Sequence, residues 1–246
     1  MSGQARRRSG REPTARILTP GGRHRRWAVL LLAIPLPLRA QAVPLVLPVV
    51  LPAEDIGEEH YGDPPSIPAG ERWMGLYADA DTSWLQEVEV RWERREGEEL
   101  GGHTYVVEPA TPLLLLVGVP QIRPGPAETV LRQTESTYSG GSSVDLPMAS
   151  TPYTFIVSAE DPDACDATVT LSDGERSQVL FTPAMEPFSC DGPHFDLHWA
   201  GDLDGDRRLD LLATFSLKYS SHPRRLFLSS AAAPGALVGE VALFRR

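Results

Sequence analysis

Short segments of about four to eight residues, each apolar or alternating between apolar and polar side chains, recur along most of this chain. They are rich in β-branched and aromatic residues and are bounded by glycine, proline, aspartate or serine; the 246 residues include 21 glycines and 23 prolines. Longer stretches with the apolar spacing of a helix are scarce. The pattern predicts an all-β fold, an antiparallel β-sandwich or a barrel-like domain.

Two segments illustrate the pattern. Residues 84–94, WLQEVEVRWER, alternate between apolar and charged side chains, which predicts a half-buried strand with Trp84, Val88, Val90 and Trp92 on its apolar side. Residues 112–119, PLLLLVGV, are apolar on both faces, which predicts a central strand. Further strand candidates are residues 103–109, 153–159, 167–173, 176–182, 194–200 and 224–230. Residues 124–147 predict a long loop or a hairpin with a glycine-serine tip.

The N-terminal region has the features of an export signal. Residues 1–26 contain eight arginines and one acidic residue, and the apolar segment Trp27–Leu38 follows them. Residues 40–42, Ala-Gln-Ala, match the small-x-small pattern of signal peptidase sites. Repeated prolines after this segment argue against a membrane-spanning helix. We therefore expect a signal peptide over residues 1–42 and a periplasmic or secreted protein.

The remaining chain divides into two parts by composition. Residues 43–70 are proline-rich and then acidic, without a periodicity that would bury one face, and predict a disordered tether. Residues 71–246 then form the β-rich part, either as one domain or as two small units, 71–147 and 149–246. Without residues 1–42 the chain has 14 basic and 32 acidic residues, a net charge of −18, which argues against nucleic acid as a partner.

Cysteine usage agrees with export. The chain has two cysteines, Cys165 and Cys190, and in an oxidising compartment we expect them to pair. The disulfide would contribute about 3 kcal/mol through the entropy of the loop it closes. Two buried thiols remain the alternative.

The segment AGDLDGDRRLDLLA, residues 200–213, concentrates negative charge. Calcium takes six to eight oxygen ligands, and carboxylates at positions 1, 3 and 5 of a loop supply them as the chain curls around the ion. Without a cation, carboxylates this close repel each other. The spacing predicts one structural calcium ion, with a solvated acidic turn as the alternative. Its ligands would be the carboxylates of Asp202, Asp204, Asp206 and Asp210 and the backbone carbonyl of Arg208.

This stretch resembles the Asp-rich loops of FG-GAP repeats in integrin-type β-propellers and, more loosely, dockerin and EF-hand loops. The resemblance covers about a dozen residues, 201–212, and implies structural calcium binding rather than an activity. Two positions depart from the pattern: Arg207 stands where a glycine usually makes the sharp turn, and Ala213 stands where an EF-hand has a bidentate glutamate. The flanking residues alternate like strands, so we expect the loop to join two strands.

A second group of possible ligands lies in residues 194–199, HFDLHW. His194, Asp196 and His198 would share one face of a strand, and two imidazoles with a carboxylate can bind zinc or iron. Alternate residues on a strand face are about 7 Å apart, which is long for shared coordination. We therefore expect the three apolar residues to face the core and the histidines to lie on the solvated face.

Catalytic motifs are absent from the sequence: it contains no Gly-x-Ser-x-Gly, Ser-x-x-Lys or His-Glu-x-x-His, and no phosphate-binding or dinucleotide-binding loop. The sequence predicts no catalytic residue and favours a non-enzymatic, calcium-stabilised module that binds a protein or glycan ligand. The alternative is a secreted, glycan-active hydrolase whose carboxylates come from distant segments.

Overall fold

The structure is a computed structural model that describes residues 48–61, 72–79, 82–94, 102–108, 110–132, 137–161, 164–186 and 189–244. The expected signal peptide lies outside these residues and stays a prediction. The described residues belong to one compact unit, Val43–Arg246. Within them, no helix has the length and apolar character needed to cross a membrane.

The predicted all-β fold is confirmed, since the described residues form strands and three short 3-10 helices, η1 (Ala53–Asp55), η2 (Pro183–Met185) and η3 (Ser229–Ala231). The strands are β1 (Val49–Pro52), β2 (His60–Tyr61), β3 (Trp73–Ala78), β4 (Ser83–Val88), β5 (Val90–Arg94), β6 (Gly102–Val107), β7 (Leu114–Val117), β8 (Gly125–Arg132), β9 (Ser142–Pro147), β10 (Pro152–Ser158), β11 (Thr168–Ser172), β12 (Ser177–Phe181), β13 (His194–Asp202), β14 (Asp210–Ser216), β15 (Arg224–Leu228) and β16 (Gly239–Phe244).

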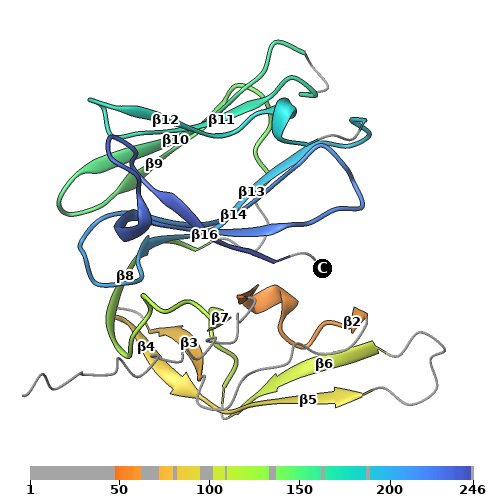
Figure 1. Ribbon diagram of the computed structural model, residues 1–246, viewed down its shortest axis with the longest axis vertical. Coiled ribbons are helices and arrows are strands. Elements are labelled where there is room, and N and C mark those ends of the chain that lie inside the picture. Colours follow the sequence, from red (N-terminus) through yellow and green to blue (C-terminus); the bar gives the residue numbers. More distant parts are fainter. Residues whose placement is uncertain are drawn as a thin grey trace, which may run out of the picture. The chain divides into compact units, whose positions relative to one another are not determined.

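These strands form three antiparallel sheets (Figure 1). The largest has the order β1-β7-β3-β4-β8-β13-β14-β15-β16, and its first strand also contacts β15 and β16, so the sheet nearly closes into a barrel. The second has the order β12-β11-β10-β9, and the third β2-β6-β5. The sequence left open whether residues 71–147 and 149–246 form separate units. The nine-stranded sheet contains strands from both, because β8 pairs with β4 on one side and with β13 on the other.

Strands β13 and β14 are buried on both faces. On one face, aromatic side chains of the β9–β12 sheet, including Phe155 and Phe181, pack against Phe195 and Phe215. On the other face, Trp199 belongs to a cluster that includes residues from β1, β3 and β7. The loop that joins β13 to β14 therefore begins and ends in the most buried part of the molecule.

A bulge changes the predicted faces of β13. The pairing of β13 with β14 shifts register between Leu197 and Trp199, at His198. Leu197 packs with the β9–β12 sheet, whereas Trp199 packs on the opposite side. The expectation that Trp199 shares a face with Phe195 and Leu197 is wrong, because an extra residue in one strand reverses the alternation beyond it.

The expectation of a tether over residues 43–70 is wrong for Val49–Tyr61. β1 is fully buried and pairs with β7, and η1 follows it directly. Proline ends this short strand and begins the turn, which is where a β-strand tolerates it. Residues 43–47 and 62–70 lie outside the described residues.

Residues 84–94 form two strands rather than one. β4 pairs with β3 and β8, whereas β5 pairs with β6 in another sheet. Leu85 is the buried residue of β4, and Trp92, expected on the apolar side, is 54% exposed. The change of sheet at Glu89 breaks the alternation that predicted one continuous apolar face.

Three other expectations can be compared with the structure. Cys165 and Cys190 form the predicted disulfide, with their Cα atoms 5.8 Å apart. β7, predicted as central, lies between β1 and β3. Residues 124–147 contain β8 and β9, but these belong to different sheets, so they do not form a hairpin with each other.

Candidate metal centre

The Asp-rich loop joins β13 to β14, as expected for a loop between two strands. Asp202 is the last residue of β13 and Asp210 the first of β14. Gly201, just before the loop, has no room for a side chain, because a Cβ there would collide with the carbonyl of Glu128 on β8. Three adjacent strands therefore fix where the loop begins.

The carboxylate of Asp202 organises the loop from within. It accepts hydrogen bonds from the backbone N–H groups of Gly205 at 2.8 Å, Asp206 at 3.1 Å and Arg207 at 2.9 Å. An aspartate that gathers several backbone donors folds the following residues back over itself. The chain thus curls around the carboxylate instead of extending away from it.

The curl requires two left-handed residues, Gly205 with φ +85° and Arg207 with φ +65°. Arg207 occupies the position at which the related loops carry glycine. The sharp turn is therefore made by an arginine. Its left-handed backbone conformation is unfavourable for a residue with a Cβ.

The middle of the loop contacts η3, the turn that follows β15. The Ser230 hydroxyl donates to Asp204, and the Ser229 hydroxyl donates to Asp206 at 2.6 Å. The backbone N–H of Arg208 also donates to Asp206, at 2.8 Å. Two consecutive serines thus tie the acidic loop to a second turn of the chain.

Asp210 is the most buried of the four aspartates, with 0% of its surface exposed. Its two carboxylate oxygens accept the backbone N–H groups of Leu203 at 2.7 Å and Ser229 at 2.8 Å. Burial raises the pKa of Asp210 to about 8, the two N–H donors oppose that rise, and the charges of Asp204 and Asp206 add to it. Burial is also the largest cause of a raised pKa at Asp204.

Three of the predicted ligands come together. Asp202, Asp204 and Asp210 each place a carboxylate oxygen within 4.8 Å of the others, so they could hold a metal ion. Asp206 is not one of this group and instead contacts Ser229 and Arg208. The backbone N–H of Arg208 donates to Asp206. Its carbonyl stays a predicted ligand.

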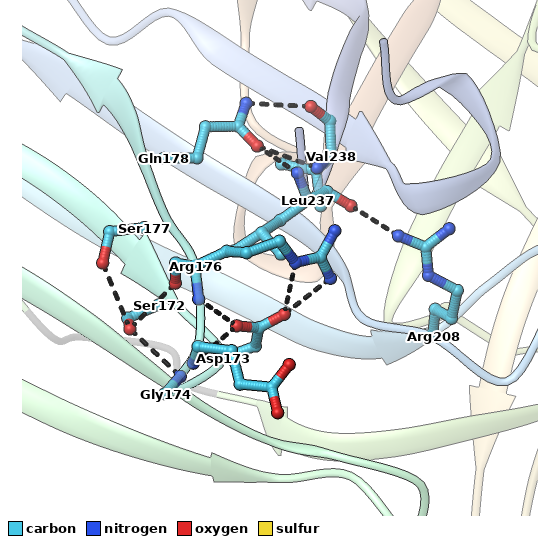
Figure 2. Close-up of polar contacts among 10 residues, drawn as sticks. Ser172, Asp173, Gly174, Arg176, Ser177, Gln178, Arg208, Leu237 and Val238 are labelled. Atoms are coloured by element: carbon cyan, nitrogen blue, oxygen red, sulfur yellow. Dashed lines mark hydrogen bonds and ion pairs between the residues drawn. The ribbon is translucent and has the colours of Figure 1, made fainter. Parts of the chain in front are cut away.

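The side chain of Arg208 reaches the segment before β16. Its guanidinium donates to the carbonyl of Leu237 at 3.3 Å, and Figure 2 shows this contact beside Gln178 of β12. Gln178 accepts the N–H groups of Leu237 at 2.6 Å and Val238 at 2.9 Å and donates to the Val238 carbonyl at 2.9 Å. Arg208 thereby links the loop to the segment before β16 and leaves the negative charge of the loop in place.

Within the part of the chain that the structure describes, no cationic side chain forms an ion pair with the loop aspartates. Among the described residues, the ion pairs involve other carboxylates, and none includes Asp202, Asp204, Asp206 or Asp210. The donors on these aspartates are backbone N–H groups and serine hydroxyls. Oxygen ligands of this kind suit a hard divalent cation such as calcium, which would supply the missing positive charge.

The sequence did not identify Ser229 and Ser230 as part of this centre. The two serines belong to η3 and contact a loop that is 23 to 26 residues earlier in the chain. Local sequence spacing does not reveal contacts over such a separation. The one available signal was the pair of small hydroxyl residues directly after the strand segment RRLFL.

The histidine group of β13 separates into two environments. At the bulge, His198 Nε2 accepts from Arg224 at 2.8 Å, and its Nδ1 lies 2.9 Å from Glu54. Arg224 also makes a two-bond ion pair with Asp55, at 2.7 and 2.9 Å. His194, four residues before the bulge, is 9% exposed, and the His198 side chain is 8% exposed, so the expectation that these histidines lie on a solvated face is wrong.

Comparison of the chain with known protein families, with curated proteins and with solved structures gives no match.

Proposed function

We propose that this protein is an exported, non-enzymatic β-domain in which one calcium ion stabilises the loop between β13 and β14. The carboxylates of Asp202, Asp204 and Asp210 supply the first ligands. Asp206, the carbonyl of Arg208 and water complete the coordination. The observation that carries this proposal is a group of three carboxylates within 4.8 Å of one another, two of them buried, that form no ion pair with a cationic side chain among the described residues.

The role of the ion follows from what the loop touches. Asp204, Asp206 and Asp210 each contact η3, through Ser230 or Ser229. An ion that neutralises these aspartates removes their mutual repulsion and so strengthens the junction between the β13–β14 loop and the end of β15. Calcium is thus a structural component of the nine-stranded sheet.

A polar groove beside this sheet is the surface we assign to a ligand. It has a volume of about 490 Å³ and includes residues of β8, from Pro126 to Arg132, together with Asp79, Thr82 and Ser83. Its hydroxyl and carboxylate groups suit a ligand rich in hydrogen-bonding groups, such as a glycan. Glu128 lines this groove, and in the sheet it lies opposite Asp202, where β8 pairs with β13. The calcium loop therefore also supports the ligand surface.

The test is a thermal melt of residues 43–246, oxidised, first with excess calcium and then with a chelator. A single ion at a hundredfold excess over its Kd should add about 2.7 kcal/mol to the free energy of unfolding. Asp204→Asn with Asp206→Asn keeps the hydrogen-bond acceptors but should abolish the response to calcium.

The matched control is Glu160→Gln with Glu175→Gln, which removes two negative charges from exposed residues outside the loop. This variant should respond to calcium as the wild type does. If calcium leaves the wild-type melt unchanged, the loop is a solvated acidic turn and the proposal fails.

A further inference from the structure

His194, the first residue of β13, contains a buried nitrogen that makes no hydrogen bond to any described residue. The residue is 9% exposed, this nitrogen is Nε2, and its Nδ1 lies 3.3 Å from the carbonyl of Gly192. A neutral imidazole has one N–H and one lone pair. Donation from Nδ1 to Gly192 therefore leaves the lone pair on Nε2, where burial without a hydrogen-bond donor is unfavourable.

A second imidazole lies against this ring. His222, in the segment between β14 and β15, has its ring centroid 4.5 Å from that of His194, with 35° between the ring planes. His222 is exposed, so an ion in solution can reach the pair.

We propose that His194 and His222 bind one divalent transition-metal ion of the zinc class at a site separate from the Asp-rich loop. Neutral imidazole nitrogens are preferred ligands of such ions. A histidine ligand commonly donates its other N–H to a backbone carbonyl, which fixes the ring and its tautomer. The contact between His194 and Gly192 has this arrangement.

Charged groups of both signs lie near His222. Asp196, two residues along β13, accepts from Thr137 at 2.8 Å and acts on His222 as a nearby negative charge. Arg224 is the opposing positive charge, but its guanidinium is paired with Asp55 through two hydrogen bonds. The backbone of Gly192 is held by its N–H bond to Leu217 at 3.3 Å and by the disulfide two residues earlier, at Cys190.

This site and the proposed calcium site are at opposite ends of β13. His194 is its first residue and Asp202 its last, so they are separated by roughly 25 Å at the rise of an extended strand. The ligands also differ, nitrogen at one end and carboxylate oxygen at the other. Calcium can therefore saturate the loop while zinc is tested at the histidines.

The experiment is a calorimetric titration of the full chain with zinc chloride at pH 7.5 in saturating calcium. We expect one zinc ion per chain, and at least a tenfold loss of affinity in each of His194→Ala and His222→Ala. His103→Gln removes a histidine elsewhere and should leave the isotherm unchanged, as should Asp204→Asn with Asp206→Asn. In long-range ¹H–¹⁵N NMR spectra, zinc should shift the side-chain nitrogens of His194 and His222.

Three results would overturn the site. The first is a wild type that takes up no zinc at 100 µM. The second is unchanged affinity in the variant that carries both His194→Ala and His222→Ala. The third is zinc binding that disappears with the loop aspartates instead. If His194→Ala fails to fold, the exposed His222→Ala variant and the NMR shifts still decide the question.

Discussion

The backbone N–H of Ser229 donates to the buried carboxylate of Asp210 at 2.8 Å, while the hydroxyl of the same serine donates to Asp206 at 2.6 Å. One residue of η3 therefore holds two aspartates of the β13–β14 loop. The backbone contact survives any substitution that keeps the fold, but the hydroxyl contact does not. The two contributions can be separated by mutation.

Ser229→Ala should lower the free energy of unfolding by about 1 kcal/mol in the absence of calcium, because it removes one hydrogen bond from a buried residue. Urea unfolding with an unchanged slope measures the effect. Ser230→Ala, at the exposed neighbouring residue, is the comparison and should cost less. Equal losses of unfolding free energy in the two variants would show that burial does not increase the contribution of the Ser229 hydroxyl.

Calcium affinity should increase with pH because of Asp210. Its pKa is about 8 in the folded protein, so at pH 6 the ion must displace a proton. Below pH 8 the apparent affinity should rise by about tenfold per pH unit and then level off. Calcium titrations at pH 6, 7 and 8 test this, and a constant affinity would contradict the raised pKa.

The stability of the calcium-free protein should move in the opposite direction. A carboxyl whose pKa is raised on folding takes up a proton when the chain folds at any pH between its unfolded and folded pKa values. The folded state is therefore favoured at low pH, and this contribution is lost as pH rises from about 4 towards 8. Asp210→Asn should flatten that part of the pH profile.

Asp55→Ala should destabilise the protein by about 3–5 kcal/mol, because it leaves the buried guanidinium of Arg224 without its two-bond partner. Glu240→Ala removes the partner of Arg225, an ion pair nearer the surface, and should cost less than about 1 kcal/mol. Urea denaturation of both variants compares them directly. Similar losses would mean that burial does not strengthen the Asp55–Arg224 pair.

Arg207→Gly should stabilise the protein by about 0.5–1 kcal/mol, because glycine adopts a φ of +65° without the steric cost that arginine bears. Arg207→Ala removes the same charge but keeps the Cβ, so it should give little or no gain. A gain in both variants would indicate that loss of positive charge, rather than backbone relief, is responsible.

The sequence predicted features that depend on neighbouring residues. The period of two along the strands predicted the all-β class. The spacing of Asp202, Asp204, Asp206 and Asp210 predicted a group of carboxylates in a loop between strands, and the structure brings three of the four together, without Asp206. Arg207 stood as a departure from the resembled loops, yet it adopts the left-handed conformation for which those loops use glycine. Each of these properties is set within a few residues of chain.

Features that depend on distant segments were missed or misjudged. The prolines around β1 predict a tether, whereas the burial of this strand depends on its pairing with the distant β7. Trp92 was expected in the core because alternation does not show that the chain changes sheets at Glu89. The bulge at His198 and the contacts of Ser229 likewise arise from pairing between strands, which no local period encodes.

The pair between Asp55 and Arg224 spans 169 residues of chain. A ribosome that adds about 5–20 residues per second needs roughly 10–30 s to make the chain between them. Throughout that interval β1 exists while β15 does not, so the nearly closed sheet can be completed only late in synthesis. β1 can therefore pair with β7 long before β15 and β16 exist, and it waits for the end of synthesis only for its contacts with those last two strands.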